Sequence, residues 1–527
     1  MKRLRKSQVG ILFLLLLLAS FAIKWQVFAN SANIYDQIQR FIQVVQVVQR
    51  YYVEDVDPEK LVTGAINGML GELDPHTVYI SSERLKDINE EFEGAFEGIG
   101  VEFVLQNKIP TVIAPIPDTP SEKLGIRPGD QIVKIEGHST YGASEDEIMI
   151  QLRGPKNSQV VITIKRPGQK EAIELRITRD SIPLYSITTY FMIDKSTGYI
   201  RIGKFSKTTN EEFENALEEL ESKGLKQLIV DLRDNSGGYL EQAVEIADKF
   251  LDGGKRIVYT RGRTENSNED YYATTEATHP TMPLIVLINH GSASASEILA
   301  GAMQDWDRGL IVGETSFGKG LVQNQIELKD GSAIRVTVAR YYTPSGRLIQ
   351  RSYENGIKDY LAQGFDDVDP NATPDSSLHQ PSFTTSSGRK VYGGGGITPD
   401  IIVPSEKTNL STAKLIQSQV FLEYGSNFAT RHKELSRDFE FFREQFRITD
   451  GLLRDFKKLA RTKKIAVDEA SIDSDLAFIK RRLKSQIARS LWGAREYYQI
   501  EVSEDRQVRR ALKLFSQAAK IAGLSLD

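Results

Sequence analysis

The stretch Gly291-Ser-Ala-Ser-Ala-Ser-Glu297 decides the interpretation of this chain, because it joins a strand pattern to a helical pattern. Residues 284–288 are fully apolar, as in a buried strand, and residues 297–304 have helical spacing. A strand, a tight turn of small residues and a helix N-terminus place a serine hydroxyl beside unpaired backbone N–H groups. Such groups can stabilise an oxyanion, so the stretch predicts a serine nucleophile.

Three serines in this turn compete for the nucleophile's role. Ser292, Ser294 and Ser296 alternate with alanines, so their hydroxyls do not all point into one site. Ser294 with Glu297 also fits the Ser-x-x-Glu capping box, in which the serine only caps a helix. Both interpretations fit the turn itself.

A second stretch, Phe317-Gly-Lys-Gly-Leu-Val-Gln323, supplies a lysine in a glycine-rich, largely apolar segment. A free lysine titrates near ~10.4, whereas a general base must be neutral. Burial lowers a lysine's pKa, and a shift of roughly three units corresponds to about 4 kcal/mol. Ser294 and Lys319 therefore predict a Ser-Lys dyad. We expect Glu297 to cap the helix or position Ser294 rather than to pair with the lysine.

Two other interpretations use the same region. Residues 313–319 fit G-x-x-x-x-G-K, the start of a phosphate-binding loop, but Gly320 stands where Ser or Thr should hold Mg²⁺. Residues 321–339 alternate like a hairpin, not like the helix that such a loop requires. His290 adjoins the serines, yet no Asp is spaced to orient it. The six histidines have no zinc-binding spacing, so no metal is expected.

The two stretches together resemble the signature of the C-terminal processing peptidases, also called tail-specific serine proteases. Residues 289–298 and 313–323 match it without a gap. The resemblance implies that Ser294 is the nucleophile, Lys319 the general base and Gln323 the residue that orients the lysine. It also implies acyl-enzyme chemistry without a cofactor, on an α/β multidomain fold with a crotonase-like core.

Residues 233–238, Arg-Asp-Asn-Ser-Gly-Gly, follow a further apolar strand pattern. They resemble the family's D-L-R-x-N-x-G-G element, from which a glycine N–H enters the oxyanion hole. The resemblance indicates Gly238, with Gly237 as the close alternative, and Ala295 as the second donor. A glycine turn that only satisfies helix geometry is compatible with both.

Residues 92–182 are expected to form short strands with one helix and to resemble a PDZ domain. Such domains bind a peptide's terminal carboxylate through backbone N–H groups. The resemblance implies that this domain binds the C-terminal tails of protein or peptide substrates and gates the protease, by activation or by inhibition. A plain glycine turn is the alternative for the loop expected to bind the carboxylate, which comprises Gly98, Ile99, Gly100 and Val101.

Composition and the N-terminus bound the remaining possibilities. The 527 residues exceed one typical domain, and a net charge of −4 gives no reason to expect nucleic acid as a partner. The chain contains no cysteine, which excludes a cysteine nucleophile and disulfides. Basic residues at positions 2, 3, 5 and 6 precede an apolar stretch at 9–23, as in a signal peptide. Cleaved signal and retained inner-membrane anchor both fit, and both place the protease in the periplasm or elsewhere outside the cytoplasm.

The expected organisation has five parts. Residues 351–390, within the core, are expected to be an irregular surface loop. The flanking helical regions are expected to serve assembly or gating, in keeping with a homo-oligomer. An adaptor or lipoprotein is a further candidate partner. The runner-up function is a non-catalytic PDZ-type tail receptor, against which the full Ser-Lys-Gln set argues. The parts are a signal or anchor at 1–29, a helical region at 31–90, the PDZ domain at 92–182, the peptidase core at 183–405 and a helical domain at 406–527.

Overall fold

The computed structural model describes residues 34–274, 277–362, 381–463, 465 and 469–524, so the expected signal or anchor at 1–29 lies outside the described residues. The chain divides into two units, Met1–Tyr79 and Ile80–Asp527. No helix among the described residues is both long and apolar enough to cross a bilayer.

The first unit contains a helix over residues 34–51 and the helix α2 (Pro58–Gly71). Asp57 caps α2 by accepting the N–H of Glu59 at 3.0 Å. Within the helical region expected at 31–90, the turn-rich residues 73–77 predict a break. After this break, residues 78–80 form the strand β1 (Val78–Ile80) and not helix. The physical reason is a turn: the Asp74 carboxylate accepts the N–H groups of His76 and Thr77 and ends the helical run.

A six-stranded sheet lies at the centre of the second unit, in the order β10-β11-β12-β15-β16-β21. β10 is antiparallel to β11, and the other neighbours are parallel. The strands are β10 (Ile187–Met192), β11 (Thr197–Ile202), β12 (Gln227–Asp231), β15 (Leu284–Ile288), β16 (Leu310–Gly313) and β21 (Ile401–Ile402).

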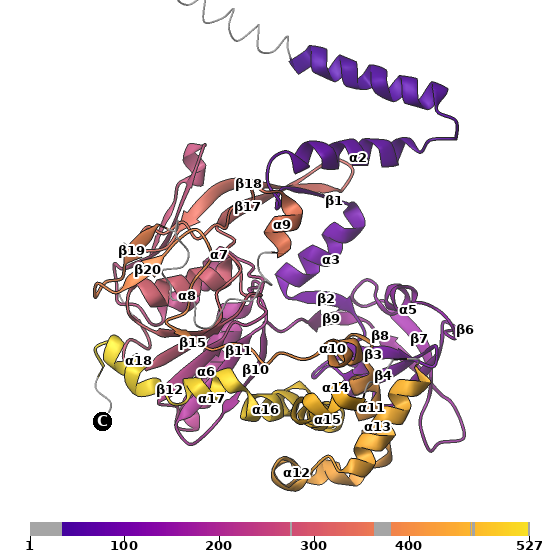
Figure 1. Cartoon of the computed structure of the whole chain (residues 1–527). Helices are drawn as coiled ribbons and strands as arrows, with labels where there is room; N and C mark the ends of the chain where they lie inside the picture. The colour runs from indigo at the N-terminus through magenta and orange to yellow at the C-terminus, as the bar shows by residue number, and fades with distance from the viewer. Residues whose placement is uncertain (1–33, 275–276, 363–380, 464, 466–468, 525–527) are drawn as a thin grey trace, which may run out of the picture. The chain divides into compact units, whose positions relative to one another are not determined.

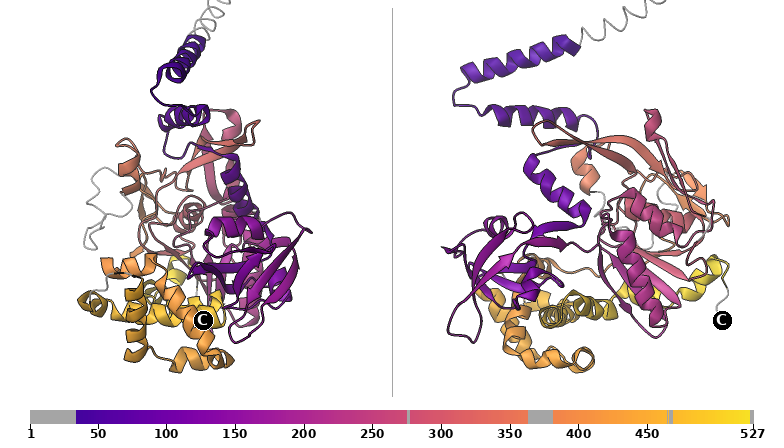
Figure 2. Two further views of the ribbon diagram at one scale, coloured as in Figure 1. Left: turned by 90° about the vertical axis from the view of Figure 1, so that its right-hand side faces the viewer. Right: turned by 180° about the vertical axis from the view of Figure 1, so that it is seen from behind.

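Helices cover both faces of this sheet because side chains alternate along its strands (Figures 1 and 2). Ile200 and Val230 pack in one core with α6 (Thr209–Ser222), α7 (Leu240–Asp248) and α8 (Ala295–Asp305). Tyr199 and Ile229 pack in a second core with α17 (Arg506–Ala511) and α18 (Phe515–Ile521). The loops after β12 and β15 leave the same edge of the sheet, which brings residues 233–238 to the serine turn.

A second sheet contains β13 (Arg256–Gly262), β14 (Asp270–Tyr272), β17 (Leu321–Glu327) and β18 (Ala333–Tyr342). β17 and β18 form the predicted hairpin. The prediction of an irregular segment at 351–390 is wrong in part. Its described residues include α9 (Ile357–Ala362), and β19 (Ser382–Thr384) pairs with β20 (Lys390–Tyr392).

Residues 82–183 form a helix and a small β-rich domain with its own core of buried isoleucines, valines and leucines. Its main sheet has the order β3-β4-β5-β7-β8, with β6 beside β5, and β2 pairs with β9. It contains two helices where one was expected, because the four-residue α4 follows Thr119. The elements are α3 (Ser82–Glu93), β2 (Ala95–Gly98), β3 (Val101–Gln106), β4 (Ile109–Pro115), α4 (Pro120–Lys123), β5 (Gln131–Ile135), β6 (His138–Ser139), α5 (Glu145–Leu152), β7 (Gln159–Lys165), β8 (Ile173–Thr178) and β9 (Asp180–Pro183).

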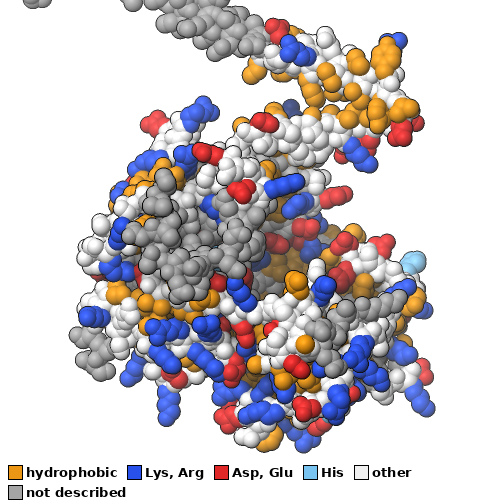
Figure 3. All heavy atoms as spheres, viewed as in Figure 1, with side chains coloured by type: hydrophobic (Ala, Val, Ile, Leu, Met, Phe, Trp, Pro, Cys, Tyr) orange, Lys and Arg blue, Asp and Glu red, His pale blue; other side chains and the backbone are white. Residues whose placement is uncertain are grey.

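The described part of the C-terminal region consists mostly of helices. Arg489 forms an ion pair with Glu102 of β3 at 3.0 Å. Asp505 forms an ion pair at 2.8 Å with Arg233, which lies in the loop after β12 of the central sheet. Lys and Arg side chains are frequent on its surface, with Asp and Glu among them (Figure 3). Before α17, its α-helices are α10 (Leu410–Gln417), α11 (Val420–Arg431), α12 (Phe439–Gln445), α13 (Asp450–Thr462), α14 (Glu469–Ser474), α15 (Leu476–Leu491) and α16 (Ala494–Glu504).

Candidate active site

The three serines of the turn have different surroundings. Ser292 is buried, and its Oγ donates to the Leu232 carbonyl at 2.8 Å. Ser296 is also buried, and its Oγ donates to the Asn235 carbonyl at 2.9 Å. Ser294 is half-buried, and its hydroxyl donates a hydrogen bond to no other group in the described part of the chain. Only Ser294 therefore presents a hydroxyl that is available for chemistry.

Ser294 occupies the N-cap of α8 in an unusual backbone conformation, with φ of 55°. Positive φ in a residue other than glycine costs of order 1–3 kcal/mol and is found mostly where the surrounding structure enforces it. The predicted capping box is present as well, and the Glu297 carboxylate accepts the Ser294 N–H at 2.8 Å. The capping and nucleophile interpretations are therefore compatible.

Lys319 lies in the loop before β17 and is half-buried. Its Nζ donates to Oε1 of Gln323 at 3.0 Å, which joins the two residues that the sequence places four positions apart. The Gln323 side chain is neutral, so it can orient the amine without the bias toward the charged form that a carboxylate would add. The structure thus brings the predicted lysine and glutamine together.

Glu297 holds the serine turn and the lysine loop to each other. Its carboxylate is fully buried, and burial raises its pKa although four donors favour the charged form. Glu297 accepts a hydrogen bond from the backbone N–H of Lys319 and not from its amine, as expected if Glu297 positions the loop. The donors are the N–H groups of Ser294 (2.8 Å), Gly318 (2.7 Å) and Lys319 (2.9 Å) and the Oγ of Ser316 (2.5 Å).

Tyr341 of β18 forms a second link between the same two segments. Its side chain is fully buried, and its hydroxyl oxygen lies 3.1 Å from the Ser294 carbonyl and 2.7 Å from the Lys319 carbonyl. Sequence reasoning missed this residue, because a tyrosine in an alternating strand gives no signal of a partner on another element. Glu297 and Tyr341 together fix the two backbones from the buried side.

We predict that Tyr341→Phe lowers the rate of peptide cleavage about tenfold and the stability by about 1 kcal/mol, because a buried hydroxyl bridging two carbonyls is lost. kcat, KM and denaturant unfolding measure these effects. Tyr342→Phe is the matched control, since the Tyr342 hydroxyl makes no hydrogen bond in the described residues. An unchanged kcat in Tyr341→Phe would contradict the positioning role.

The expected oxyanion donors come from two loops. Ala295 follows Ser294 in the chain, and a Cβ at Gly237, the residue before Gly238, would lie 2.8 Å from the Ser294 Cβ. Neither the Gly238 N–H nor the Ala295 N–H has a hydrogen-bond acceptor within the residues that the structure describes. Gly237 differs, since its N–H donates to Oδ1 of Asn235 at 2.9 Å. A Cβ at Gly238 would lie 1.9 Å from the Phe205 carbonyl oxygen, so only glycine fits there. The free N–H favours Gly238 as the donor, whereas the close approach to Ser294 is made at Gly237.

The loop that carries Gly238 is anchored on both sides. The buried Asn235 accepts the Ala293 N–H at 2.9 Å through its carbonyl and thereby contacts the serine turn. Burial would raise the pKa of Asp231, but the guanidinium groups of Arg233 and Arg201 hold it well below its usual value. This ion cluster ties the start of the loop to the sheet, and Arg233 extends it to α17.

Neither alternative chemistry gains support from the geometry. The strand β17 follows Lys319, where a phosphate-binding loop needs a helix. His290 makes no hydrogen bond or ion pair within the described residues, so nothing orients its ring as a base. In that same part of the chain no three His, Asp or Glu side chains are placed to hold a metal ion.

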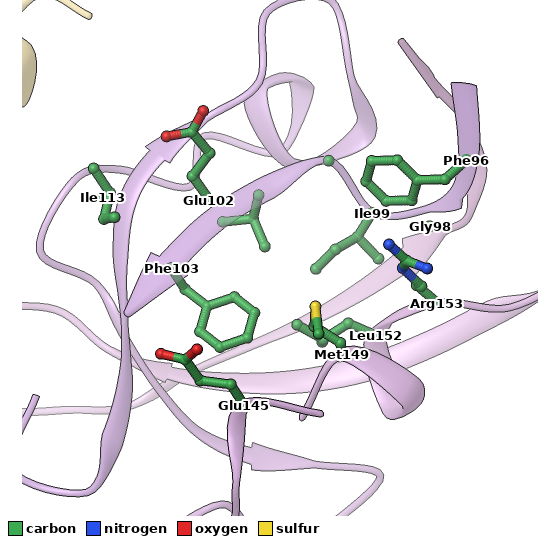
Figure 4. A pocket seen from close by; sticks show the side chains of 12 residues that line it. Phe96, Gly98, Ile99, Glu102, Phe103, Ile113, Glu145, Met149, Leu152 and Arg153 are labelled. Atoms are coloured by element: carbon green, nitrogen blue, oxygen red, sulfur yellow. The ribbon is translucent and has the colours of Figure 1, made fainter. Parts of the chain in front are cut away.

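A groove of about 330 Å³ runs between β3 and α5 in the small β-rich domain. All four residues of the expected carboxylate-binding loop line it (Figure 4). The N–H groups of Ile99 and Gly100 have no acceptor among the described residues. Gly100 has φ of 78°, and a Cβ there would meet Thr119 at 2.3 Å, so this turn requires glycine. Two N–H groups without an acceptor, at the end of an apolar groove, can donate hydrogen bonds to a carboxylate.

Four family models match the chain. Residues 196–359 match peptidase family S41, and residues 98–177 match the PDZ domain. Residues 22–84 match the activating protease CtpB N-terminal domain. Residues 412–493 match a family of unknown function, DUF8443.

Two curated relatives are similar over most of their length. A carboxy-terminal-processing protease of Bartonella bacilliformis is 41% identical over 325 residues, which are 61% of this chain and 74% of the relative. The carboxy-terminal processing protease CtpA of Bacillus subtilis is 35% identical over 364 residues, which are 67% of this chain and 77% of the relative.

Proposed function

The chain belongs to peptidase family S41, among the serine-type carboxy-terminal processing proteases, and on that premise we propose that it cleaves proteins with a Ser294–Lys319 dyad. One observation carries the assignment. Of the three serines in the turn, only Ser294 has a hydroxyl that donates no hydrogen bond among the described residues. The Lys319 amine, oriented by Gln323, is the base. The predicted family, the α/β multidomain fold class and the PDZ domain are confirmed.

The proposed reaction follows from these positions. Lys319 removes the proton of Ser294 as Oγ attacks the peptide carbonyl carbon. The resulting oxyanion accepts hydrogen bonds from the N–H groups of Gly238 and Ala295. Lys319 then protonates the leaving amine, and water hydrolyses the acyl-enzyme by the same steps in reverse order. No cofactor enters this scheme.

A fluorophosphonate probe tests the nucleophile directly, because it reacts covalently with an activated serine hydroxyl. Labelling of Ser294, located by peptide mass spectrometry, is expected for the full chain. A chain that binds tails but takes no label would favour the non-catalytic receptor.

We propose that the PDZ domain binds the substrate's C-terminal tail through Ile99 and Gly100. Amidating the C-terminus of a peptide substrate is then expected to raise KM about tenfold with a smaller change in kcat, because the charge-assisted hydrogen bonds of the carboxylate are lost. Steady-state kinetics on matched acid and amide peptides measure this. Equal KM values for the two peptides would refute tail binding.

We further propose that tail binding is coupled to catalysis through α3. Arg153 lines the groove and bonds Asp87 and Glu90 of α3 at 3.0 and 2.9 Å. At the end of α3, the Phe92 ring packs on Tyr239, which follows Gly238, at a centroid distance of 5.1 Å. Removal of residues 92–180 tests the coupling, and an unchanged rate with unchanged tail preference would exclude it.

The helix over residues 34–51 supports a homo-oligomer. Apolar side chains along it are exposed (Figure 3), among them Ile34 at 67% and Val47 at 56%. Exposed apolar surface of this kind marks an interaction site, and a second copy of the chain is the proposed partner. Sedimentation of the chain with and without residues 34–51 distinguishes a monomer from an oligomer.

The sequence pattern at 1–29 supports export to the periplasm or another space outside the cytoplasm. The division of the chain into the five parts given above is also proposed. We also propose a lipoprotein or adaptor partner that switches on the protease activity. Fractionation and capture of bound proteins by Ser294→Ala test these two points.

A further inference from the structure

The groove between β3 and α5 has a charge distribution that selects among tails. Among tails that end in an apolar residue, we propose that it prefers those with a lysine or arginine two residues before the end, and that Glu145 recognises this cation. The inference rests on the proposed tail binding, because it concerns the same groove and adds which side chains a bound tail carries.

The free N–H groups fix the direction of the tail. Ile99 and Gly100 lie at one end of the groove, and β3 leads from there toward Phe103. Figure 4 shows the Glu145 carboxylate beside the Phe103 ring, and Met149 and Leu152 nearer Ile99. A tail whose carboxylate meets Ile99 and pairs antiparallel with β3 therefore runs past Phe103 with its earlier residues.

Strand and helix spacings place the two side chains that face α5. In a strand, alternate residues point the same way and lie about 7 Å apart. Along α5, at about 1.5 Å per residue, Met149 and Glu145 lie about 4.5 and 10 Å from Leu152. The last side chain of the tail thus lies among Ile99, Met149 and Leu152. The side chain two residues earlier passes Met149, where a long cationic side chain reaches Glu145.

The other charged residues of the groove are already paired. Arg153 is held by its ion pairs to α3 and stacks over the Phe96 ring at 4.9 Å. Glu102 is held by Arg489 at 3.0 Å. Glu145 is exposed and makes no hydrogen bond or ion pair within the described residues, and it faces the groove. The far half of the groove therefore presents one uncompensated negative charge to a bound tail.

Binding of labelled peptides to the full chain with Ser294→Ala, measured by fluorescence anisotropy near 0.15 M salt, tests the proposal. The peptides share an apolar last residue and carry Lys, Ala or Asp two residues before it. We expect about threefold weaker binding for Ala and about tenfold for Asp than for Lys, since one exposed charge pair has a modest effect. Higher salt should reduce the difference.

Variants assign the effect to one residue. Glu145→Gln should remove the preference, and Glu145→Lys should reverse it in favour of Asp. Asp146→Lys is the matched control, because Asp146 is exposed in the same helical turn and does not line the groove. A preference that Asp146→Lys abolishes equally would overturn the role of Glu145.

The outcomes separate this inference from tail binding itself. If amidation weakens binding but Lys, Ala and Asp peptides bind alike, tail binding stands and the charge preference is refuted. If amidation has no effect on any peptide, tail binding fails first. A serine in place of the apolar last residue should weaken binding about tenfold, since its apolar contacts are lost. Equal binding would contradict the placement of the last side chain among Ile99, Met149 and Leu152.

Discussion

Replacing Ser294 with alanine is expected to lower the rate of peptide cleavage by about four orders of magnitude or more, because the only uncommitted hydroxyl of the turn is lost. Loss of a nucleophile removes the covalent route altogether, and the rate that remains comes from the oxyanion donors and substrate binding alone. The fold should persist, since no hydrogen bond donated by this hydroxyl is lost. kcat/KM with a fluorogenic peptide and a thermal unfolding scan measure the two effects.

The neighbouring serines are the matched controls. Ser292→Ala loses bonds to Leu232 and Asn289, and Ser296→Ala loses one to Asn235. Each variant should be less stable by about 1–3 kcal/mol, because buried polar groups are left unpaired, yet still cleave within about tenfold of the parent rate. An inactive but fully folded Ser292→Ala or Ser296→Ala, with Ser294→Ala active, would show that the nucleophile was assigned to the wrong serine.

The local part of the site could be predicted from sequence, since strand, turn and helix are adjacent in the chain. The apolar run at 284–288, the small residues after it and the capping pair of Ser294 and Glu297 each left a pattern. The same holds for the β17–β18 hairpin, whose alternation excluded a phosphate-binding loop. The Lys319–Gln323 contact also spans only four residues.

The contacts that join distant segments could not be predicted. Tyr341 bridges the carbonyls of Ser294 and Lys319, and the Asn235 carbonyl accepts hydrogen bonds from the serine turn. Partners of this kind on distant segments leave no periodicity. The turn at 73–77 was predicted, but the strand β1 that follows it was not, because three residues are too short to show alternation. The β19–β20 pair was missed because three-residue strands are too short to show alternation.

Lys319→Ala is expected to reduce cleavage nearly as much as Ser294→Ala, and the double variant should be no slower than the slower single one. The two residues act in one proton transfer, so the loss of either removes the whole step. kcat/KM values of both single variants and the double variant give the comparison. Losses that multiply in the double variant would show that the two side chains act independently.

The pH profile tests whether Lys319 is the base. The amine works only after losing its proton, so kcat/KM should rise with pH. Gln323→Glu puts a carboxylate where Oε1 now lies, 3.0 Å from Nζ. A carboxylate stabilises the ammonium and raises the pKa of Lys319, so the rising limb should move to higher pH. Gln323→Ala, the control, loses the orienting bond without adding charge and should lower kcat without that displacement. A rising limb that stays in place in Gln323→Glu would mean that another group titrates.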